Sequence, residues 1–422
     1  MLQNTLELRL YEEMLKIPLL DIHSHINPLK PTAKSLDDLL GYHYYTELAH
    51  SAGMPTNCLA PDFDPRERCR TLLKHASRFD NTIQFEWLAD IARIFLGFMG
   101  ENLTADDAEK LWDLAEKKMS QPDWEAQVLR ISQVERVFLT NDFDDPLEGF
   151  DLARYIPCLR VDDLVFQFDQ RSIRSRLSQC TGVEVHSTKT LKEALNAVFK
   201  RFLEKHAKAC AVSLPPDFEP ENISESDFER ALQDFSNESN RRTLAHGIFW
   251  MLAECCREHQ LPFDLMIGVN RGVYAGGVHQ GRDLFDQRTS LRQFAGLFNA
   301  FPTATFCVSV LTSAQNQELV SYAWIFPNVV CNGHWWYANI PTYIELDCQA
   351  RLQAAPRTKQ LGYYSDAYRL EFILPKYNMY RQVLTRILAR EYVLGRGWTE
   401  TQAIELARQL LRENAQRIFR LA

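Results

Sequence analysis

The chain has no CxxC pair and no framework of evenly and closely spaced cysteines, although it contains 10 cysteines in 422 residues. This absence excludes a zinc ribbon and a small secreted domain held together by disulfides. No apolar run approaches the length of a membrane span, and the charged N-terminal stretch MLQNTLELRLYEEMLKIP lacks the apolar core of a signal peptide. We therefore expect a cytoplasmic protein with reduced thiols and no membrane partner.

Basic residues are not in excess either. The formal net charge is −8, and because nucleic-acid binding requires a concentrated basic face, we expect no nucleic-acid partner. An anionic small molecule would need a local cluster of Arg or Lys. Hydrophobic residues make up 46% of the chain and charged residues 24%, which are ordinary values for a globular protein with a sizeable core.

Short apolar, β-branched or cysteine-containing runs alternate with helical patterns along the chain. This alternation is typical of βαβ units and a parallel sheet. We count eight such runs, and eight parallel strands with intervening helices predict an α/β fold of the (β/α)8 TIM-barrel class. The runs are 18–25, 134–140, 156–159, 210–214, 263–268, 303–310, 329–333 and 361–366.

The gap between the first and second runs is far longer than an ordinary crossover. Within it, residues 85–98 (FEWLADIARIFLGF) and 105–119 have helical periodicity. We therefore predict a single domain over residues 1–422 with a helical insertion at about residues 30–130. Two C-terminal helices are expected at 376–390 and 399–419, the second with Thr399 as its N-cap.

The first run ends in two histidines, in the stretch LLDIHSH. On a strand, His23 and His25 point to the same face, so both imidazoles can meet one ion. Imidazole suits Zn²⁺ and its first-row neighbours, and the carboxyl ends of barrel strands are where active sites lie. The alternative is that one histidine is a core residue and the other is exposed, since two-residue patterns are common.

The best third ligand is Asp366, at the end of the eighth run in GYYSDAYR. In a closed barrel, strands one and eight are neighbours, so Asp366 would lie beside His23 and His25. Three protein ligands with an open position describe a catalytic metal site. Alternatively, Asp366 caps the helix that follows it.

Several segments, in order along nearly the whole chain, resemble the uronate isomerases of the amidohydrolase superfamily. DIHSHI is similar to their opening DxHxHL, and GYHYYTELAHSAGMP to the His-Tyr segment that follows. LTNDFDDPLEGF resembles their Thr-Thr-Asp-Asp-Pro strand end, and CLRVDD their Arg-Pro-Asp. FDLMIGVNRG, NGHWWYAN and GYYSDAYRLEFILPKYNMYRQVL resemble three later motifs of the family.

The resemblance implies one divalent metal ion, with zinc as the expected ion, and interconversion of the aldose and ketose forms of a hexuronate such as D-glucuronate or D-galacturonate. The reaction needs a polarised carbonyl, a base that moves a proton between C2 and C1, and cations for the C6 carboxylate. His23, His25 and Asp366 would hold the metal. Asp366, or a water on the metal, would relay the proton, and His43 is a second acid–base candidate.

Arginines and tryptophans at strand ends are the expected substrate-binding residues. Arg160 and Arg271 can form charge-assisted bonds to the substrate carboxylate, and Trp335 and Trp336 can pack against the sugar. Arg160 could instead pair with neighbouring acids, Asp162 or Asp163, and one tryptophan could serve only the core.

The sequence departs from the family within the expected site. Met266 stands in place of a histidine, and a thioether cannot act as acid, base or hard-metal ligand. Pro215 falls where the family has histidine, and Tyr368 where it has arginine. In an isomerase, Tyr368, Arg369 or Lys376 would substitute for the missing groups.

Two other readings of the site stay open. A hydrolase of the amidohydrolase type would use the same metal to cleave a lactone, ester or amide. A barrel that kept its fold but lost catalysis would serve as a binding protein. The retained arginines and tryptophans favour the isomerase, whereas Met266 favours the hydrolase or an altered specificity. Which sugar acid is used, and whether the protein is a homo-oligomer, the sequence leaves undecided.

Overall fold

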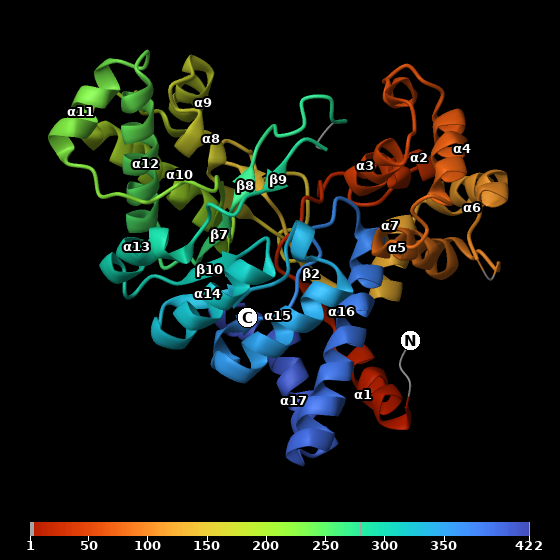
Figure 1. The fold of residues 1–422 in the computed structure, drawn as a ribbon. Helices are drawn as coiled ribbons and strands as arrows, with labels where there is room; N and C mark the ends of the chain where they lie inside the picture. Colours follow the sequence, from red (N-terminus) through yellow and green to blue (C-terminus); the bar gives the residue numbers. More distant parts are fainter. Residues whose placement is uncertain (1–3, 101, 279–280, 422) are drawn as a thin grey trace.

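The computed structural model describes residues 4–100, 102–278 and 281–421 as an α/β fold in which helices surround parallel strands (Figure 1). Each of the eight predicted runs overlaps at least one strand, although the run 361–366 does so only at Leu361. The number of strands was predicted too low, because the run 156–159 is divided between two strands and β3 lies outside every run. The parallel strands are β1 (Leu19–Asp21), β2 (Val134–Phe138), β3 (Asn141–Asp142), β4 (Tyr155–Ile156), β5 (Cys158–Arg160), β6 (Ala209–Leu214), β7 (Phe263–Ile267), β10 (Phe306–Ser309), β11 (Val329–Asn332) and β12 (Gln360–Leu361).

Hydrogen bonds arrange these strands in two sheets, ordered β1-β2-β4 and β12-β11-β10-β7-β6-β5-β3. The chain passes between the two sheets three times, from β2 to β3, from β3 back to β4 and from β4 to β5. The last of these passages occurs at Pro157, which has no N–H to donate to a ladder. The N–H of the next residue, Cys158, donates to the side-chain oxygen of Asn141 at 3.3 Å.

Helices fill the long gap between β1 and β2. They are α2 (Leu36–Leu40), α3 (His43–Ser51), α4 (Pro65–Ala76), α5 (Ile83–Ile91), α6 (Ala108–Met119) and α7 (Trp124–Ser132). Figure 1 shows most of them, in red to orange, gathered at one side of the strands. A π-helical turn, η2 (Ala92–Leu96), continues α5.

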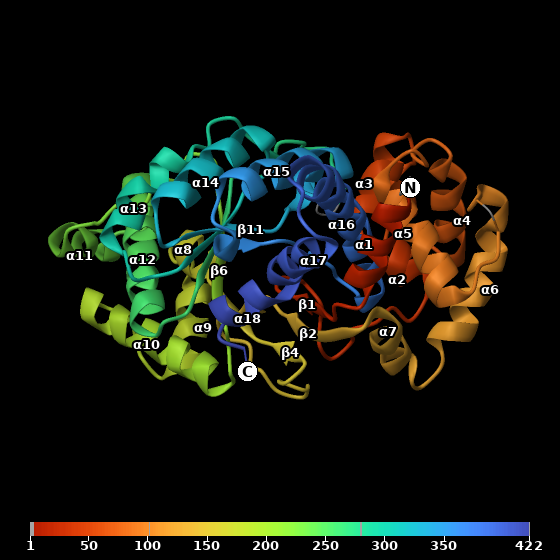
Figure 2. The same cartoon turned by 90° about the horizontal axis from the view of Figure 1, so that it is seen from below.

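The remaining helices lie around the strands (Figure 2). They are α8 (Asp162–Phe166), α9 (Arg171–Thr181), α10 (Thr188–Glu204), α11 (Glu225–Gln233), α12 (Glu238–Glu258), α13 (Ala295–Ala300), α14 (Ser313–Ile325) and α15 (Pro341–Ala354). The N-terminal helix α1 (Thr5–Leu15) packs against α16 (Ile373–Ile387) and α17 (Glu400–Arg408), and α18 (Asn414–Ile418) ends the chain. Thr399 caps α17 as predicted, accepting a hydrogen bond from the N–H of Gln402.

One pair of strands was not expected. The chain beyond β7 forms a short antiparallel hairpin of β8 (Val269–Asn270) and β9 (Leu284–Phe285). The sequence between them is rich in glycine and polar residues, so it gave no strand pattern. Among the described helices, none combines the length and the apolar composition needed to cross a bilayer. All ten cysteines are free, and nine of them are buried.

Candidate functional site

The two histidines beyond β1 face the same side of the chain, as the alternation of a strand requires. Ser24, between them, turns the other way: its hydroxyl donates to the carbonyl of Phe138 at 2.7 Å. The segment is joined to the chain beyond β12, because the N–H of His25 donates to the carbonyl of Ala367 at 2.8 Å and the N–H of Asp366 to the carbonyl of His23 at 3.1 Å. The ends of the first and last predicted strands therefore lie side by side.

Asp366 places its carboxylate between the two imidazoles. Its Oδ1 lies 3.6 Å from His23 Nε2 and 3.3 Å from His25 Nε2, and one ligand atom from each of the three residues falls within 4.8 Å of the others. Arg369, and not Asp366, is the N-cap of the following 3₁₀ turn, η7 (Leu370–Phe372). The alternative that Asp366 caps this turn is therefore wrong.

Asp264 orients His23 from the other side. The Oδ2 of Asp264 lies 3.6 Å from His23 Nδ1, and its Oδ1 accepts a hydrogen bond from the amide of Asn332 at 2.9 Å. With Nδ1 directed at a carboxylate, His23 presents Nε2 toward Asp366. This is the carboxylate–histidine arrangement that fixes the tautomer and ring orientation of metal-binding histidines.

The electrostatics of the three residues suit a cation. Burial opposes protonation of His23, but Asp264 and Asp366 outweigh it and raise its pKa. Burial lowers the pKa of His25. Burial would favour the neutral acid at Asp366, yet the two histidines hold the pKa of its carboxyl well below the usual range. Asp366 and His25 thus have the protonation states that metal ligands need, whereas a metal ion would have to displace the proton that the two carboxylates favour on His23.

Two atoms of this group have no hydrogen-bond partner among the described residues, although both are buried: His23 Nε2 and Asp366 Oδ1. Buried polar atoms are nearly always satisfied, so orphaned atoms require an explanation. A divalent cation between them would provide it. The residues present therefore fit the metal that the sequence predicts.

Every predicted site residue except His23, Arg369 and Lys376 lines one cavity of about 180 Å³. Drug-sized ligands occupy pockets of roughly 300–1,000 Å³, so this cavity suits a smaller molecule. His23 lies outside the lining because its side chain is only 2% exposed. The lining consists of His25, His43, Arg160, Ser213, Met266, Arg271, Asp283, Trp335, Trp336, Asp366 and Tyr368.

Both arginines of the cavity are paired with carboxylates. Arg160 donates from Nε and Nη2 to Asp162 at 3.1 and 3.3 Å, so the pairing offered as an alternative does occur. Arg271 donates from Nη1 to Asp283 at 2.7 Å. An arginine carries five N–H donors, so each pair leaves donors for a second anion in the cavity.

The aromatic residues of the cavity are held by other rings. Tyr368 stacks on His25 at 5.0 Å, and Trp336 stacks on Tyr337 at 4.9 Å. Trp335 is buried within an apolar cluster while also lining the cavity, so it contributes to the core as well. Stacking and burial leave these rings few ways to move, which favours a preformed binding surface.

Two of the three residues that were expected to substitute for the missing groups of the family lie outside the cavity. Arg369 borders an adjoining hollow of about 310 Å³, and its Nη1 donates to the carbonyl of Lys30 at 3.0 Å. Lys376 is fully buried and is not part of the cavity lining. Tyr368 is the candidate that faces the cavity.

Sequence reasoning missed Asp264 and Asp283. The sequence did contain a sign of Asp264, because a charged residue inside the apolar run FDLMIG must find a buried partner. Asp283 had none, because it lies in the irregular stretch before β9 and reaches Arg271 only through the hairpin.

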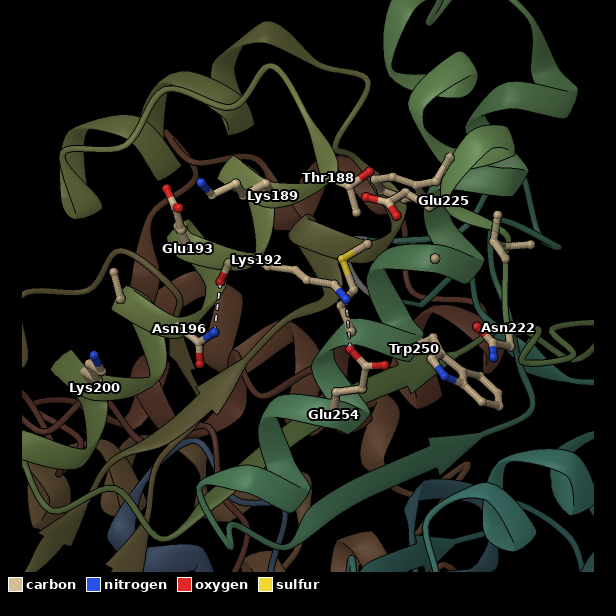
Figure 3. A pocket seen from close by; sticks show the side chains of 15 residues that line it. Thr188, Lys189, Lys192, Glu193, Asn196, Lys200, Asn222, Glu225, Trp250 and Glu254 are labelled. Carbon is tan, nitrogen blue, oxygen red and sulfur yellow. Dashed lines mark hydrogen bonds and ion pairs between the residues drawn. The ribbon is translucent and has the colours of Figure 1, made fainter.

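A larger cavity, of about 880 Å³, lies between α10 and α12 (Figure 3). None of the predicted site residues lines it. Lys192 points across it to Glu254 at 3.5 Å, and further lysines alternate with glutamates around it. With charges balanced in this way, the cavity shows no preference for an anion, so size alone does not identify the functional site.

An α/β fold with His-x-His after the first strand and Asp after the last defines an amidohydrolase-like protein. More specifically, the glucuronate isomerase family model matches residues 1–419, so the chain belongs to that family. The uronate isomerase of Thermotoga maritima is 23% identical over 92% of this chain and 91% of its own length.

Solved structures agree on the fold. The crystal structure of uronate isomerase from Thermotoga maritima superposes with a TM-score of 0.90 at 20% identity, covering 99% of this chain and 98% of that one. Glucuronate isomerase from Caulobacter crescentus gives a TM-score of 0.90 at 19% identity, covering 99% and 94%.

Proposed function

We propose that this protein is a metal-dependent isomerase that interconverts the aldose and ketose forms of a hexuronate, D-glucuronate or D-galacturonate. The observation that carries the proposal is the single small cavity lined by two metal-ligand candidates, His25 and Asp366, and by two arginines, Arg160 and Arg271. A uronate presents a carbonyl at one end and a carboxylate at the other, and this cavity holds groups for both.

The metal would be held by His23, His25 and Asp366. We propose zinc, because two imidazoles and one carboxylate with an open position are typical of catalytic zinc. When bound, the ion would polarise the carbonyl of the sugar acid. Asp264 keeps Nε2 of His23 directed at the site.

The arginines would hold the C6 carboxylate. The side chain of Arg160 is two-thirds buried and forms an ion pair with Asp162. The side chain of Arg271 is 56% exposed and forms an ion pair with Asp283. A charge-assisted bond is stronger where water is excluded, so we assign Arg160 the larger share of the binding.

Isomerisation moves one proton from C2 to C1 and another between the two oxygens, so it needs no co-reactant. Asp366 lies in the cavity wall beside the proposed metal position, so its carboxylate is the first candidate by position to accept the C2 proton, although its lowered pKa makes it a weak base. His43, in the same wall and 5.5 Å from the ring of Tyr368, is the second. Trp335, Trp336 and Tyr368 would exclude water and pack against the sugar.

We further propose that the parallel strands close into a (β/α)8 barrel within a single domain that carries the helical insertion at about residues 30–130. The chain joins the two sheets at β2–β3 and β4–β5. The hydrogen bonds of His25 and Asp366 join its first and last strands. One buried cluster takes side chains from β1, β2, β4, β5, β6, β7, β10, β11 and β12, which is how a barrel interior is filled.

Incubation of zinc-loaded protein with D-glucuronate and D-galacturonate, followed by NMR detection of the ketose, tests the proposal. We expect ketose from at least one of the two. Hydrolysis of a lactone or an N-acyl substrate without any ketose would favour the hydrolase instead. A cytoplasmic location, the absence of a nucleic-acid partner and the oligomeric state stay predictions.

A further inference from the structure

Lys376, on α16, is the most unusual charged residue near the site. Its side chain is fully buried, and its ammonium donates to the hydroxyl of Tyr42 and to the carbonyl of Ser365, both at 2.8 Å. Neither partner is a carboxylate. Burial lowers the pKa of Lys376 to about 8, against the attraction of Asp366 and Asp21. A buried cation with neutral partners is costly, so the presence of Lys376 calls for an explanation.

The surroundings of Lys376 are built to hold a cation. The ammonium lies 4.7 Å from the ring centre of Trp87, 5.0 Å from that of Tyr42 and 5.2 Å from that of Tyr44. Aromatic faces attract cations, most strongly where water is excluded. The rings of Tyr42, Tyr44 and Trp87 thus form a cage around the ammonium. Tyr44 lies on α3 and Trp87 on α5, so the helical segment between β1 and β2 provides this cage.

Through Tyr42, the cation reaches Asp366. The hydroxyl of Tyr42 accepts from Lys376 and donates to the backbone carbonyl of Asp366 at 2.9 Å. The carbonyls of two consecutive residues, Ser365 and Asp366, are thus held by one connected pair of side chains. On the other side, the N–H of Ser365 donates to Asp21 at 2.7 Å.

The backbone held in this way is strained. Asp366 has a φ of 52°, in the left-handed region that non-glycine residues rarely adopt. Such a conformation persists only where the surroundings impose it. In that conformation its carboxylate is directed at His23 and His25.

We infer that Lys376 and Tyr42 act as a clamp that holds Ser365 and Asp366 in this backbone conformation and so positions the carboxylate of Asp366 for the metal. They are positioning residues, since neither is part of the proposed ligand set. The inference rests on the metal site of the proposed function. It also gives the helices between β1 and β2 a part in the chemistry, because they carry the cage around the cation.

Two variants test the clamp, each with a matched control. Lys376→Met removes the cation. Tyr42→Phe removes only one hydroxyl from a buried ring, so it should keep the fold even if Lys376→Met does not. Lys359→Met is the control for the lysine, because Lys359 also donates to two backbone carbonyls, those of Ala323 and Phe326. Tyr392→Phe is the control for the tyrosine, since Tyr392 donates to the carbonyl of Leu352 at 3.0 Å.

The measurement is zinc affinity by competition with a chelator, together with the absorption spectrum of the cobalt-substituted protein. We expect both clamp variants to bind zinc about 10- to 100-fold more weakly and to change the cobalt spectrum, as loss of residues that support metal ligands typically does. The controls should keep wild-type affinity and spectrum, whatever their melting temperatures.

Wild-type affinity and spectrum in Tyr42→Phe would overturn the clamp, as would an equal loss in the controls. These outcomes leave the proposed function intact, because tight zinc binding by the wild type supports the metal site independently. A wild type that takes up no zinc would overturn the metal site and the clamp together.

Discussion

Asp264→Asn is the substitution that best distinguishes a residue that orients a metal-binding histidine from a residue that binds the metal itself. Asp264 lies 3.6 Å from His23 Nδ1 and does not belong to the group of three metal-ligand candidates. Asparagine preserves the volume and can keep the contact with Asn332, but it removes the charge that favours the correct tautomer. We expect zinc affinity at pH 8 to fall about 10- to 100-fold, or about 1.4–2.7 kcal/mol.

The same substitution should change the pH dependence of zinc binding. Zinc competes with the proton on His23, and Asp264 is one of the groups that raise the pKa of His23. The pKa of His23 should therefore fall in the variant, so the loss of zinc affinity on acidification should begin at a lower pH than in the wild type. Weaker binding at pH 8 combined with a smaller dependence on pH is not expected from general destabilisation.

A chelator competition titrated from pH 8 to pH 5 measures both effects. Asp347→Asn is the matched control, because Asp347 is a buried carboxylate on α15, outside the group of three metal-ligand candidates. Zinc affinity and pH profile that are unchanged in Asp264→Asn, or changed equally in Asp347→Asn, would refute the reasoning.

Three further predictions concern the substrate, the fold and the metal. Arg160→Met should lower kcat/KM for a uronate by roughly 10- to 100-fold, the worth of a buried charge-assisted bond, and by more than Arg271→Met does; steady-state kinetics showing the reverse order would contradict this. Burial raises the pKa of Glu371 to about 7, so the folded state keeps a proton that the unfolded chain releases near pH 4.5, and stability should fall as pH rises between these values. Glu371→Gln should reduce that fall by up to about 3 kcal/mol in denaturant titrations, and an identical pH profile would show that the carboxyl does not titrate there. Removal of zinc by a chelator should lower Tm in the wild type, and a Tm indifferent to zinc would argue against tight binding to the native state.

The periodicity of the sequence located the strands because apolar runs of this length are a local property. The contacts of the site depend in addition on which segments of the chain become neighbours in space. His23 and His25 were found because both lie in one strand end, and Asp366 because its position along the chain implied a neighbour in space. The pairing of Arg160 with Asp162 was weighed for the same local reason, since the two residues are only two positions apart.

Non-local partners were beyond the reach of the sequence. Lys376 was assigned a possible contact with substrate. In the structure, its side chain extends from α16 into a cage formed by residues from the segment between β1 and β2. No pattern along the chain relates Lys376 to Tyr42 or Trp87. The hairpin that brings Asp283 to Arg271 likewise depends on backbone pairing in a stretch without strand periodicity.

Ketose formation by wild type and by Asp366→Asn, both supplied with zinc and assayed on D-glucuronate and D-galacturonate, tests the central claim most directly. The variant keeps the size of the side chain but replaces the ionised carboxylate that faces both histidines. We predict turnover by the wild type and its loss in a variant that remains folded. Wild-type rates in Asp366→Asn, or no ketose from a wild type that holds zinc, would contradict the account.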